Sequence, residues 1–350
     1  MKHYIGLDVS LKTTQICIID EKGRIVKEKT AKTDPEDIYA AIISIENLNI
    51  EKIALETGHM CHFLTKGLEK KGLPVICVDA RRAKTFLKLK YNKTDRNDAQ
   101  GIAEGLRLDF FGEIFTKNSD ELGPNTLLHS RRLLVDQRKQ LQQAIRGHFK
   151  SYGIVMKSHD GIAFYNEVQK QLLDMNEIAA TALRTLLETY KQLVCSVKEL
   201  DREVKEQCKE KEKLLMTIPG IGPVTALTFT SEISNPKRFR RSRQVGAYLG
   251  MTPRQYSSGE TEKMGPISKT GPTTLRSLLV EAGMVVLTRT QKWSKLKAWG
   301  MKIQKKHGTK KAAVAVGRKL GVMMHRMMLT GKDFQYTDKT EEQNTKRKAA

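Results

Sequence analysis

The chain has few cysteines and no long apolar stretch. Its five cysteines are odd in number, scattered and without a C-x-x-C pair, which argues against a disulfide framework or a zinc ribbon and predicts reduced thiols. No stretch approaches the ~18 to 20 apolar residues that a membrane span needs, and the first residues, MKHYIGLDVS, have no hydrophobic signal-peptide region. We therefore expect a soluble, intracellular protein.

Acidic residues are scarce in the last two-fifths of the chain. Residues 214–350 hold 26 basic and 8 acidic side chains, whereas residues 1–120 hold 20 and 18, and residues 121–213 hold 16 and 13. Such a basic segment repels itself unless a polyanion neutralises it, so nucleic acid is the expected partner and an anionic membrane the weaker alternative.

Short strands and helices alternate in the first third of the sequence. Strands are predicted over 3–8, 13–20, 23–31, 52–57 and 74–79, and helices over 34–46, 61–71, 81–88 and 95–107. A hairpin meander followed by β-α-β-α predicts a mixed sheet with helices on both faces. This order fits an RNase H-like domain, although doubly wound folds share much of it.

Strand patterns are absent between residues 121 and 213. Apolar residues recur at alternating four- and three-residue steps from Leu183 to Cys208, with Asp201 at one position, which predicts a long helix with a heptad face. Two interpretations stay open: the helix packs within its own chain, or it forms a coiled coil that joins protomers. From 214 to about 330 the pattern is mainly helical.

These patterns predict an α/β plus all-α protein with four segments. They are an RNase H-like domain over 1–118, a helical and coiled-coil segment over 119–213, a mainly helical domain with a helix-hairpin-helix over 214–333, and a disordered tail over 334–350.

Four carboxylates stand where a metal site can form. Asp8 and Glu56 each end a predicted strand, and Asp95 and Asp98 lie three residues apart near the start of a predicted helix. Carboxylate oxygens suit hard divalent cations, and two Mg2+ ions can clamp the attacking and leaving oxygens of a phosphodiester displacement. Each residue alone is better explained by a cap or a surface carboxylate, with helix capping the alternative for Asp95. Together they favour a metal site.

Two further patterns suit contact with phosphate. The segment IPGIGPVTA (218–226) has the form of a helix-hairpin-helix turn, in which Gly220 and Gly222 permit a tight turn and expose backbone amides; an ordinary turn between helices is the alternative. Shortly afterwards, PKRFRRSR supplies four arginines for contact with a nucleic-acid backbone. They are Arg238, Arg240, Arg241 and Arg243.

Two adjacent serines, Ser257 and Ser258, precede a glycine in a segment rich in glycine and proline. Arg254, Lys269 and Arg276 lie near them in the sequence and are candidates for neutralising phosphate charge. Chemistry alone favours a turn for Ser-Ser-Gly, because a serine hydroxyl is a poor nucleophile unless a base, a metal or a cationic pocket activates it.

Five motifs in order carry a resemblance to a known family: GLDVS, ALETG, KTDRNDA, IPGIGPVTA and YLGMTPRQYSSG. The chain resembles, over residues 1–330, the insertion-sequence transposases with a RuvC-like DEDD domain and a C-terminal serine domain, the bridge-RNA-guided DNA recombinases. The resemblance implies that the four carboxylates are the DEDD ligands of Mg2+. It also implies that Ser258, in the family pattern G-x-x-P-x-x-x-x-S-G, is the nucleophile; the neighbouring Ser257 is a departure from the pattern.

The resemblance also implies an activity and its partners. Such an enzyme cuts and rejoins target and donor DNA through a phosphoserine intermediate, uses a structured noncoding bridge RNA, assembles as a tetramer or dimer of dimers, and works in the prokaryotic cytoplasm on the nucleoid. The alternative is an RNase H-like nuclease of the Holliday-junction resolvase type, in which the same carboxylates activate water. A sugar-kinase or actin-like ATPase fits less well because no Asp-Gly-Gly phosphate loop is present.

Overall fold

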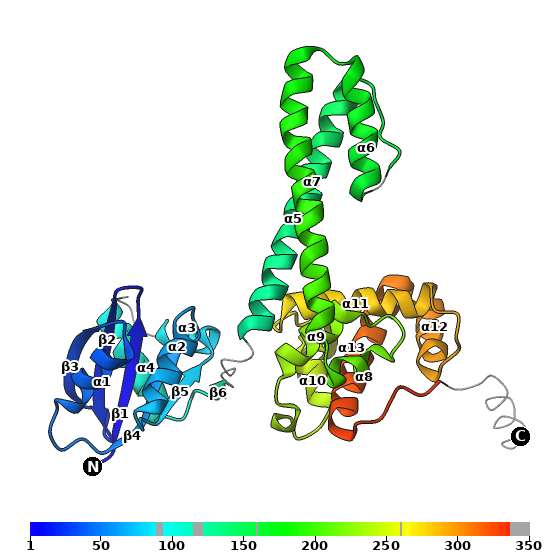
Figure 1. Ribbon diagram of the computed structural model, residues 1–350. Helices are drawn as coiled ribbons and strands as arrows, with labels where there is room; N and C mark the ends of the chain where they lie inside the picture. The colour runs from blue at the N-terminus through cyan, green and yellow to red at the C-terminus, as the bar shows by residue number, and fades with distance from the viewer. Residues whose placement is uncertain (89–93, 115–121, 159, 260, 337–350) are drawn as a thin grey trace, which may run out of the picture. The chain divides into compact units, whose positions relative to one another are not determined.

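A computed structural model describes residues 1–88, 94–114, 122–158, 160–259 and 261–336 (Figure 1). The chain divides into two compact units, Met1–Asn118 and Ser119–Ala350. The predicted domain boundaries, including the one after residue 213 inside the second unit, stay predictions. None of the helices in the described ranges is both long and apolar enough to cross a membrane.

A six-stranded mixed sheet forms the first unit. Its strands are β1 (His3–Val9), β2 (Thr13–Asp20), β3 (Ile25–Lys32), β4 (Ile50–Glu56), β5 (Val75–Val78) and β6 (Glu113–Ile114). Their order is β3-β2-β1-β4-β5-β6, with β1, β4 and β5 parallel to one another and the remaining neighbours antiparallel. The predicted mixed sheet is confirmed; the two-residue β6 was not predicted.

Alternation along β1 explains why helices cover both faces of this sheet. Ile5 and Leu7 pack into one apolar cluster with Ile38 and Leu64. Gly6 lies between them on the strand, and its Cα faces the helix on the opposite side of the sheet. The first layer is α1 (Pro35–Ile43) and α2 (Cys61–Lys70), and the second is α3 (Ala80–Leu87) and α4 (Asp95–Arg107). Helices on both faces were predicted, and this is confirmed.

A disulfide joins Cys61, at the start of α2, to Cys77 of β5. The expectation of reduced thiols is therefore wrong for this pair. Packing of α2 against β5 brings together two cysteines that are 16 residues apart, a spacing that carries no disulfide pattern in the sequence. Cys17, Cys195 and Cys208 remain thiols.

Two 30-residue helices, α5 (Leu122–Ser151) and α7 (Glu177–Glu206), run side by side in the second unit (Figure 1). A shorter helix, α6 (Gly161–Gln171), packs against α7 and is followed by the 3-10 turn η2 (Leu172–Asp174). Leu183, Leu187 and Tyr190 of the predicted heptad face are buried against α5 and α6. Asp201, the charged seam position, pairs with Arg131 of α5. The long helix is confirmed, and the described seam packs within its own chain.

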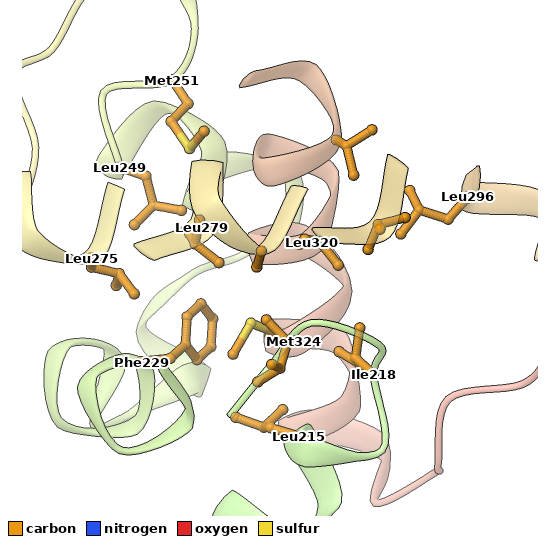
Figure 2. Packing of buried hydrophobic residues seen from close by; sticks show 14 of the residues in the cluster. Leu215, Ile218, Phe229, Leu249, Met251, Leu275, Leu279, Leu296, Leu320 and Met324 are labelled. Atoms are coloured by element: carbon orange, nitrogen blue, oxygen red, sulfur yellow. The ribbon is translucent and has the colours of Figure 1, made fainter. Parts of the chain in front are cut away.

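Six further helices surround the largest apolar core. They are α8 (Glu210–Met216), α9 (Pro223–Ile233), α10 (Arg243–Tyr248), α11 (Thr273–Thr288), α12 (Lys295–His307) and α13 (Thr309–Thr330), with the 3-10 turn η3 (Pro236–Arg238) between α9 and α10. Figure 2 shows Phe229, Leu279, Leu320 and Met324 in this core. After α13, Phe334 packs on the same core and donates its N–H to Thr217. A tail beginning at 334 therefore starts too early; residues 337–350 lie outside the described residues.

An antiparallel hairpin, β7 (Pro253–Ser258) and β8 (Thr261–Ile267), interrupts these helices. The sequence analysis placed a turn at Ser-Ser-Gly but did not predict the two strands; the turn lies at Gly259, directly after Ser258 of β7. Every β7 side chain is exposed, so neither face shows the apolar alternation by which a half-buried strand is recognised.

Candidate functional site

Asp8 and Glu56 lie at the ends of two neighbouring parallel strands, Asp8 one residue before the end of β1 and Glu56 at the last residue of β4. Leu7 of β1 is paired with Leu55 of β4, so the next residue of each strand lies at the same edge of the sheet. Asp8 and Glu56 are both half-buried. Because side chains alternate along a strand, Asp8 shares the sheet face of Gly6, which is the face that α4 covers.

Gly6 lets the backbone of α4 lie directly on β1. A Cβ atom at Gly6 would be 2.1 Å from the carbonyl oxygen of Ala99 and 2.5 Å from the backbone nitrogen of Ala103. A side chain of any size would push the helix away from the strand. Glycine at this position therefore sets the distance between the strand that carries Asp8 and the helix that carries Asp95 and Asp98.

The direction of α4 brings its first turn toward Asp8. Arg107, in the last turn, donates to the carbonyl oxygen of Glu21, which follows the end of β2 that is paired with the start of β1. The helix therefore runs antiparallel to β1. Its first turn, which carries Asp95 and Asp98, lies toward the edge of the sheet where Asp8 and Glu56 are found.

Thr94 caps α4, because its hydroxyl oxygen accepts the backbone N–H of Asn97. The capping role considered for Asp95 is therefore not realised. Asp95 is exposed and Asp98 is half-buried. Both lie in the first turn, where the helix dipole favours negative charge.

The four carboxylates do not form a closed metal shell. Across the described ranges, no three aspartate, glutamate, histidine or cysteine side chains converge closely enough to hold a metal ion. What the fold provides is a common sheet edge with carboxylate oxygens, the donors that hard divalent cations prefer. The donor set fits such a cation in chemistry and in backbone placement.

Ser258 lies on a cationic and aromatic face of the exposed hairpin. Alternation along β7 puts Arg254, Tyr256 and Ser258 on one face. Tyr256 is paired with Lys263 of β8, and residues paired across an antiparallel ladder share a face. This face could have been found from the two-residue spacing of Arg254, Tyr256 and Ser258.

Ser257 lies on the other face of the hairpin, next to an acidic residue. Its Oγ accepts a hydrogen bond from Gln255 Nε2 at 3.1 Å, and the same amide donates to Glu262 Oε1 at 2.6 Å. Ser257 is also paired with Glu262 in the ladder. The two adjacent serines therefore have opposite electrostatic surroundings, and that of Ser258 is the one that suits phosphate.

The glycine turn at 218–222 joins α8 to α9. Gly220 has φ of 85°, and a Cβ there would be 2.9 Å from the Ala282 carbonyl oxygen of α11, so the turn packs against α11. Gly222 is the N-cap residue of α9, and a Cβ there would meet nothing within 4 Å. The first turn of α9 is therefore open on that side, and its contact with phosphate stays a prediction.

The predicted phosphate-binding cations fall into two groups. Arg238 and Arg276 are half-buried and bond to the backbone: Arg238 donates to the Glu232 carbonyl at 3.1 Å, and Arg276 donates to those of Leu249 and Gly271 at 3.2 and 3.1 Å. These two guanidinium groups support the fold. The exposed members of the set are Arg240, Arg241, Arg243, Arg254 and Lys269.

Comparison with known proteins identifies the class as transposase. Residues 5–154 match a family model of transposases named for the DEDD motif and IS110, and residues 212–298 match the model described as the transposase IS116/IS110/IS902 family. The two matches together span more than half of the chain. The chain therefore belongs to the IS110/IS116/IS902 family of insertion-sequence transposases.

Individual relatives include two insertion-sequence transposases and a gene-inverting protein. The chain is 28% identical over 322 residues to the transposase for insertion sequence element IS1111A of Coxiella burnetii, covering 90% of this chain and 86% of that protein. It is 28% identical over 274 residues to the IS1328 transposase of Yersinia enterocolitica, covering 77% and 80%. It is also 24% identical over 248 residues to the pilin gene-inverting protein of Moraxella bovis, covering 69% and 68%.

Proposed function

We propose that this transposase cuts and rejoins DNA strands by metal-assisted transesterification at Ser258, guided by a structured noncoding RNA. The observation that carries the proposal is the common sheet edge of Asp8, Glu56 and the first turn of α4. An RNase H-like arrangement of carboxylates is suited to phosphodiester chemistry. Membership of the transposase family supports DNA as the substrate.

The carboxylates Asp8, Glu56, Asp95 and Asp98 are the proposed ligands of divalent cations, two Mg2+ ions per site. Bound Mg2+ supplies neutralisation of the charge that develops on the scissile phosphate. The protein's part is to keep four acidic side chains at one edge of the sheet. Carboxylates that lie near one another repel, and a bound cation relieves that repulsion. Gly6 and the packing of α4 maintain that placement.

Ser258 is the proposed nucleophile. A bond forms from Ser258 Oγ to phosphorus while the bond from phosphorus to one deoxyribose oxygen breaks. The serine proton passes to a base, and the departing oxygen takes up a proton. The phosphoserine link conserves the phosphodiester energy, so reversal of the same step by another strand end rejoins DNA without ATP. The nearby Arg254 and Lys263 share the face of Ser258 and would neutralise phosphate charge.

The basic second unit is the proposed nucleic-acid-binding part. Residues 214–350 hold 26 basic and 8 acidic side chains, and the exposed arginines near α10 and the open first turn of α9 suit sequence-independent contact with phosphates. The bridge RNA and a tetrameric or dimer-of-dimers assembly, in which protomers share carboxylates and serine, are parts of the proposal that rest on the family resemblance.

The test is a search for a covalent protein–DNA adduct. Wild-type protein with Mg2+, its copurifying RNA and the DNA ends of its own element should give an adduct that survives denaturation. Ser258→Ala should lose the adduct and recombination, whereas Ser257→Ala, the matched control on the other hairpin face, should keep both. Asp8→Asn or Glu56→Gln should lower cleavage at least about 100-fold, with DNA affinity retained.

Three outcomes would overturn parts of the proposal. An adduct mapped to Ser257 would keep the mechanism and correct the residue. Wild-type cleavage by the Ser257→Ala, Ser258→Ala double variant, without any adduct in the wild type, would instead establish the water-using nuclease. Full activity of both carboxylate variants would remove the metal-site assignment.

A further inference from the structure

A buried histidine holds both ends of the arginine-rich loop between α9 and α10. His325 of α13 is 0% exposed. Its Nε2 is 2.8 Å from the carbonyl oxygen of Pro236, and its Nδ1 is 3.0 Å from Oγ of Ser242. Because a carbonyl oxygen can only accept, Nε2 carries a proton and donates to Pro236, while Nδ1 and the Ser242 hydroxyl form the second hydrogen bond. One imidazole ring therefore connects two points of the loop that are six residues apart.

The interior of this loop is filled by aromatic and guanidinium packing. The Phe239 ring stands edge-on to the rings of His325 and Tyr248, with centroids 5.4 and 5.5 Å apart. The guanidinium of Arg238 lies 4.7 Å from the centroids of both Phe239 and Tyr248 and donates to the Glu232 carbonyl. Arg238 is thus part of the scaffold of the loop, together with His325.

All charged side chains on the exterior of the loop are cationic. Arg240, Arg241 and Arg243 are exposed, and in the part of the chain that the structure describes their guanidinium groups take part in no ion pair or hydrogen bond. The sequence has no acidic residue from 233 to 259. Three neighbouring cations without local counter-charges repel one another, and a bound polyanion relieves that repulsion.

We propose that His325 is a positioning residue that holds this loop in advance as a rigid surface for the phosphates of a nucleic-acid backbone. The inference rests on the proposed function, because it takes nucleic acid as the partner of the second unit. Its physical basis is that a loop already ordered in the free protein does not have to be ordered on binding. Arg240, Arg241 and Arg243 bind the phosphates, and His325 reduces the conformational entropy that binding costs.

The experiment measures affinity and its salt dependence with full-length protein, by fluorescence anisotropy between about 50 and 200 mM salt. The probes are a mixed-sequence DNA duplex and, separately, an RNA hairpin, and the arm with the larger effect identifies which nucleic acid the loop serves. His325→Ala should weaken binding about tenfold with an unchanged salt slope, because the arginines remain but must be ordered. His325→Gln retains a donor for the Pro236 carbonyl and should restore most of the affinity.

A matched control separates positioning from general loss of stability. Met324, the neighbouring residue of α13, is also 0% exposed and lies in the apolar core (Figure 2). Met324→Ala should leave the affinity of the folded fraction, counted by stoichiometric titration, unchanged. An equal loss of affinity in Met324→Ala, or wild-type affinity in His325→Ala, would overturn the inference.

A triple arginine variant distinguishes failure of this inference from failure of the proposed function. Replacing Arg240, Arg241 and Arg243 together by alanine should lower the log–log salt slope on duplex DNA by up to about 2.7, since each phosphate that is no longer neutralised lowers it by about 0.9. If the slope and affinity stay unchanged, the loop does not bind nucleic acid and the inference fails. The Ser258 adduct would still test the catalytic proposal independently.

Discussion

Replacing Gly6 with alanine is expected to displace α4 from the sheet and thereby separate the proposed metal ligands. The new Cβ would lie 2.1 Å from the Ala99 carbonyl oxygen, whereas ordinary contacts begin at 3.4 Å. Helix and strand therefore have to move apart by about 1.3 Å. Both atoms that obstruct the Cβ most closely belong to backbone, so no side-chain rotation can relieve the clash.

The displacement should affect activity more than folding. Overpacking of this kind costs about 1–3 kcal/mol, which a domain with its own core can tolerate. A shift of about 1 Å between groups that must act on one phosphate can lower the rate about 100-fold. Gly6→Ala should therefore remain folded, melt several degrees lower and lose about two orders of magnitude in Mg2+-dependent cleavage.

The assay combines thermal unfolding, followed by circular dichroism, with single-turnover DNA cleavage. Gly58→Ala is the control, because Gly58 lies two residues after Glu56 and a Cβ there would meet nothing within 4 Å. Wild-type melting and cleavage in Gly6→Ala would refute the close packing of α4 on β1. Loss of cleavage in Gly58→Ala as well would show that the assay responds to any change near the strand end.

Two predictions concern the paired helices α5 and α7. Burial and a hydrogen bond to Asp160 raise the pKa of Tyr190 from its ordinary 10.0 to about 12. The neutral phenol therefore contributes stability to the folded protein that is complete below pH 10.0 and is lost as the pH rises toward 12. Tyr190→Phe should cost about 1–3 kcal/mol in denaturant unfolding at neutral pH and reduce that alkaline pH dependence. Val197→Glu, at a 4% exposed seam position, should destabilise the helices by at least about 2 kcal/mol, while Lys198→Glu next to it should not. Dissociation of an assembly by a fully stable Val197→Glu protein, seen by sedimentation, would instead show that the seam joins protomers.

The sheet of the first unit could be predicted because burial there follows the periodicity of the sequence. In strands β1, β2 and β4, apolar residues either alternate with polar ones or form a continuous run between clear turns. The helices that follow have one apolar stripe each. The two-residue β6 is too short for any period. The contact of Gly6 with α4 was also not predictable, since a glycine in a strand does not reveal which backbone approaches it.

The proposed site was predictable in its residue types and only partly in its arrangement. Strand ends and the three-residue spacing placed Asp8, Glu56, Asp95 and Asp98 at one edge, but whether their side chains converge depends on rotamers that sequence does not report. The arginines were identified by charge alone. Charge could not distinguish Arg238, whose guanidinium packs within its loop, from the exposed arginines. That packing depends on contacts with Glu232 and Tyr248, which the sequence does not reveal.

The hairpin that carries Ser258 raises a last prediction about when the nucleophile becomes ordered. A two-stranded hairpin with exposed strands is marginal in water, because it buries no apolar face. Its base is better held: Ser268 and Lys269 donate backbone N–H groups to the carbonyls of Thr252 and Gly250. The β7–β8 pairing around Ser258 is at the turn end of the hairpin, furthest from these hydrogen bonds.

We therefore expect amide hydrogen exchange to be fast over residues 255–258 and 262–264 in the free protein and slow in α11 and α13, whose cores are buried. Nucleic acid that engages the face of Ser258, Tyr256 and Lys263 should protect the hairpin, since phosphate and base contacts supply the partner surface it lacks. Hairpin amides that are as protected as those of α11 in the free protein would mean a preformed nucleophile. Protection that rises on DNA binding in α10 but not in the hairpin would place the scissile phosphate away from Ser258, and would favour a reaction in which the carboxylates act without the serine.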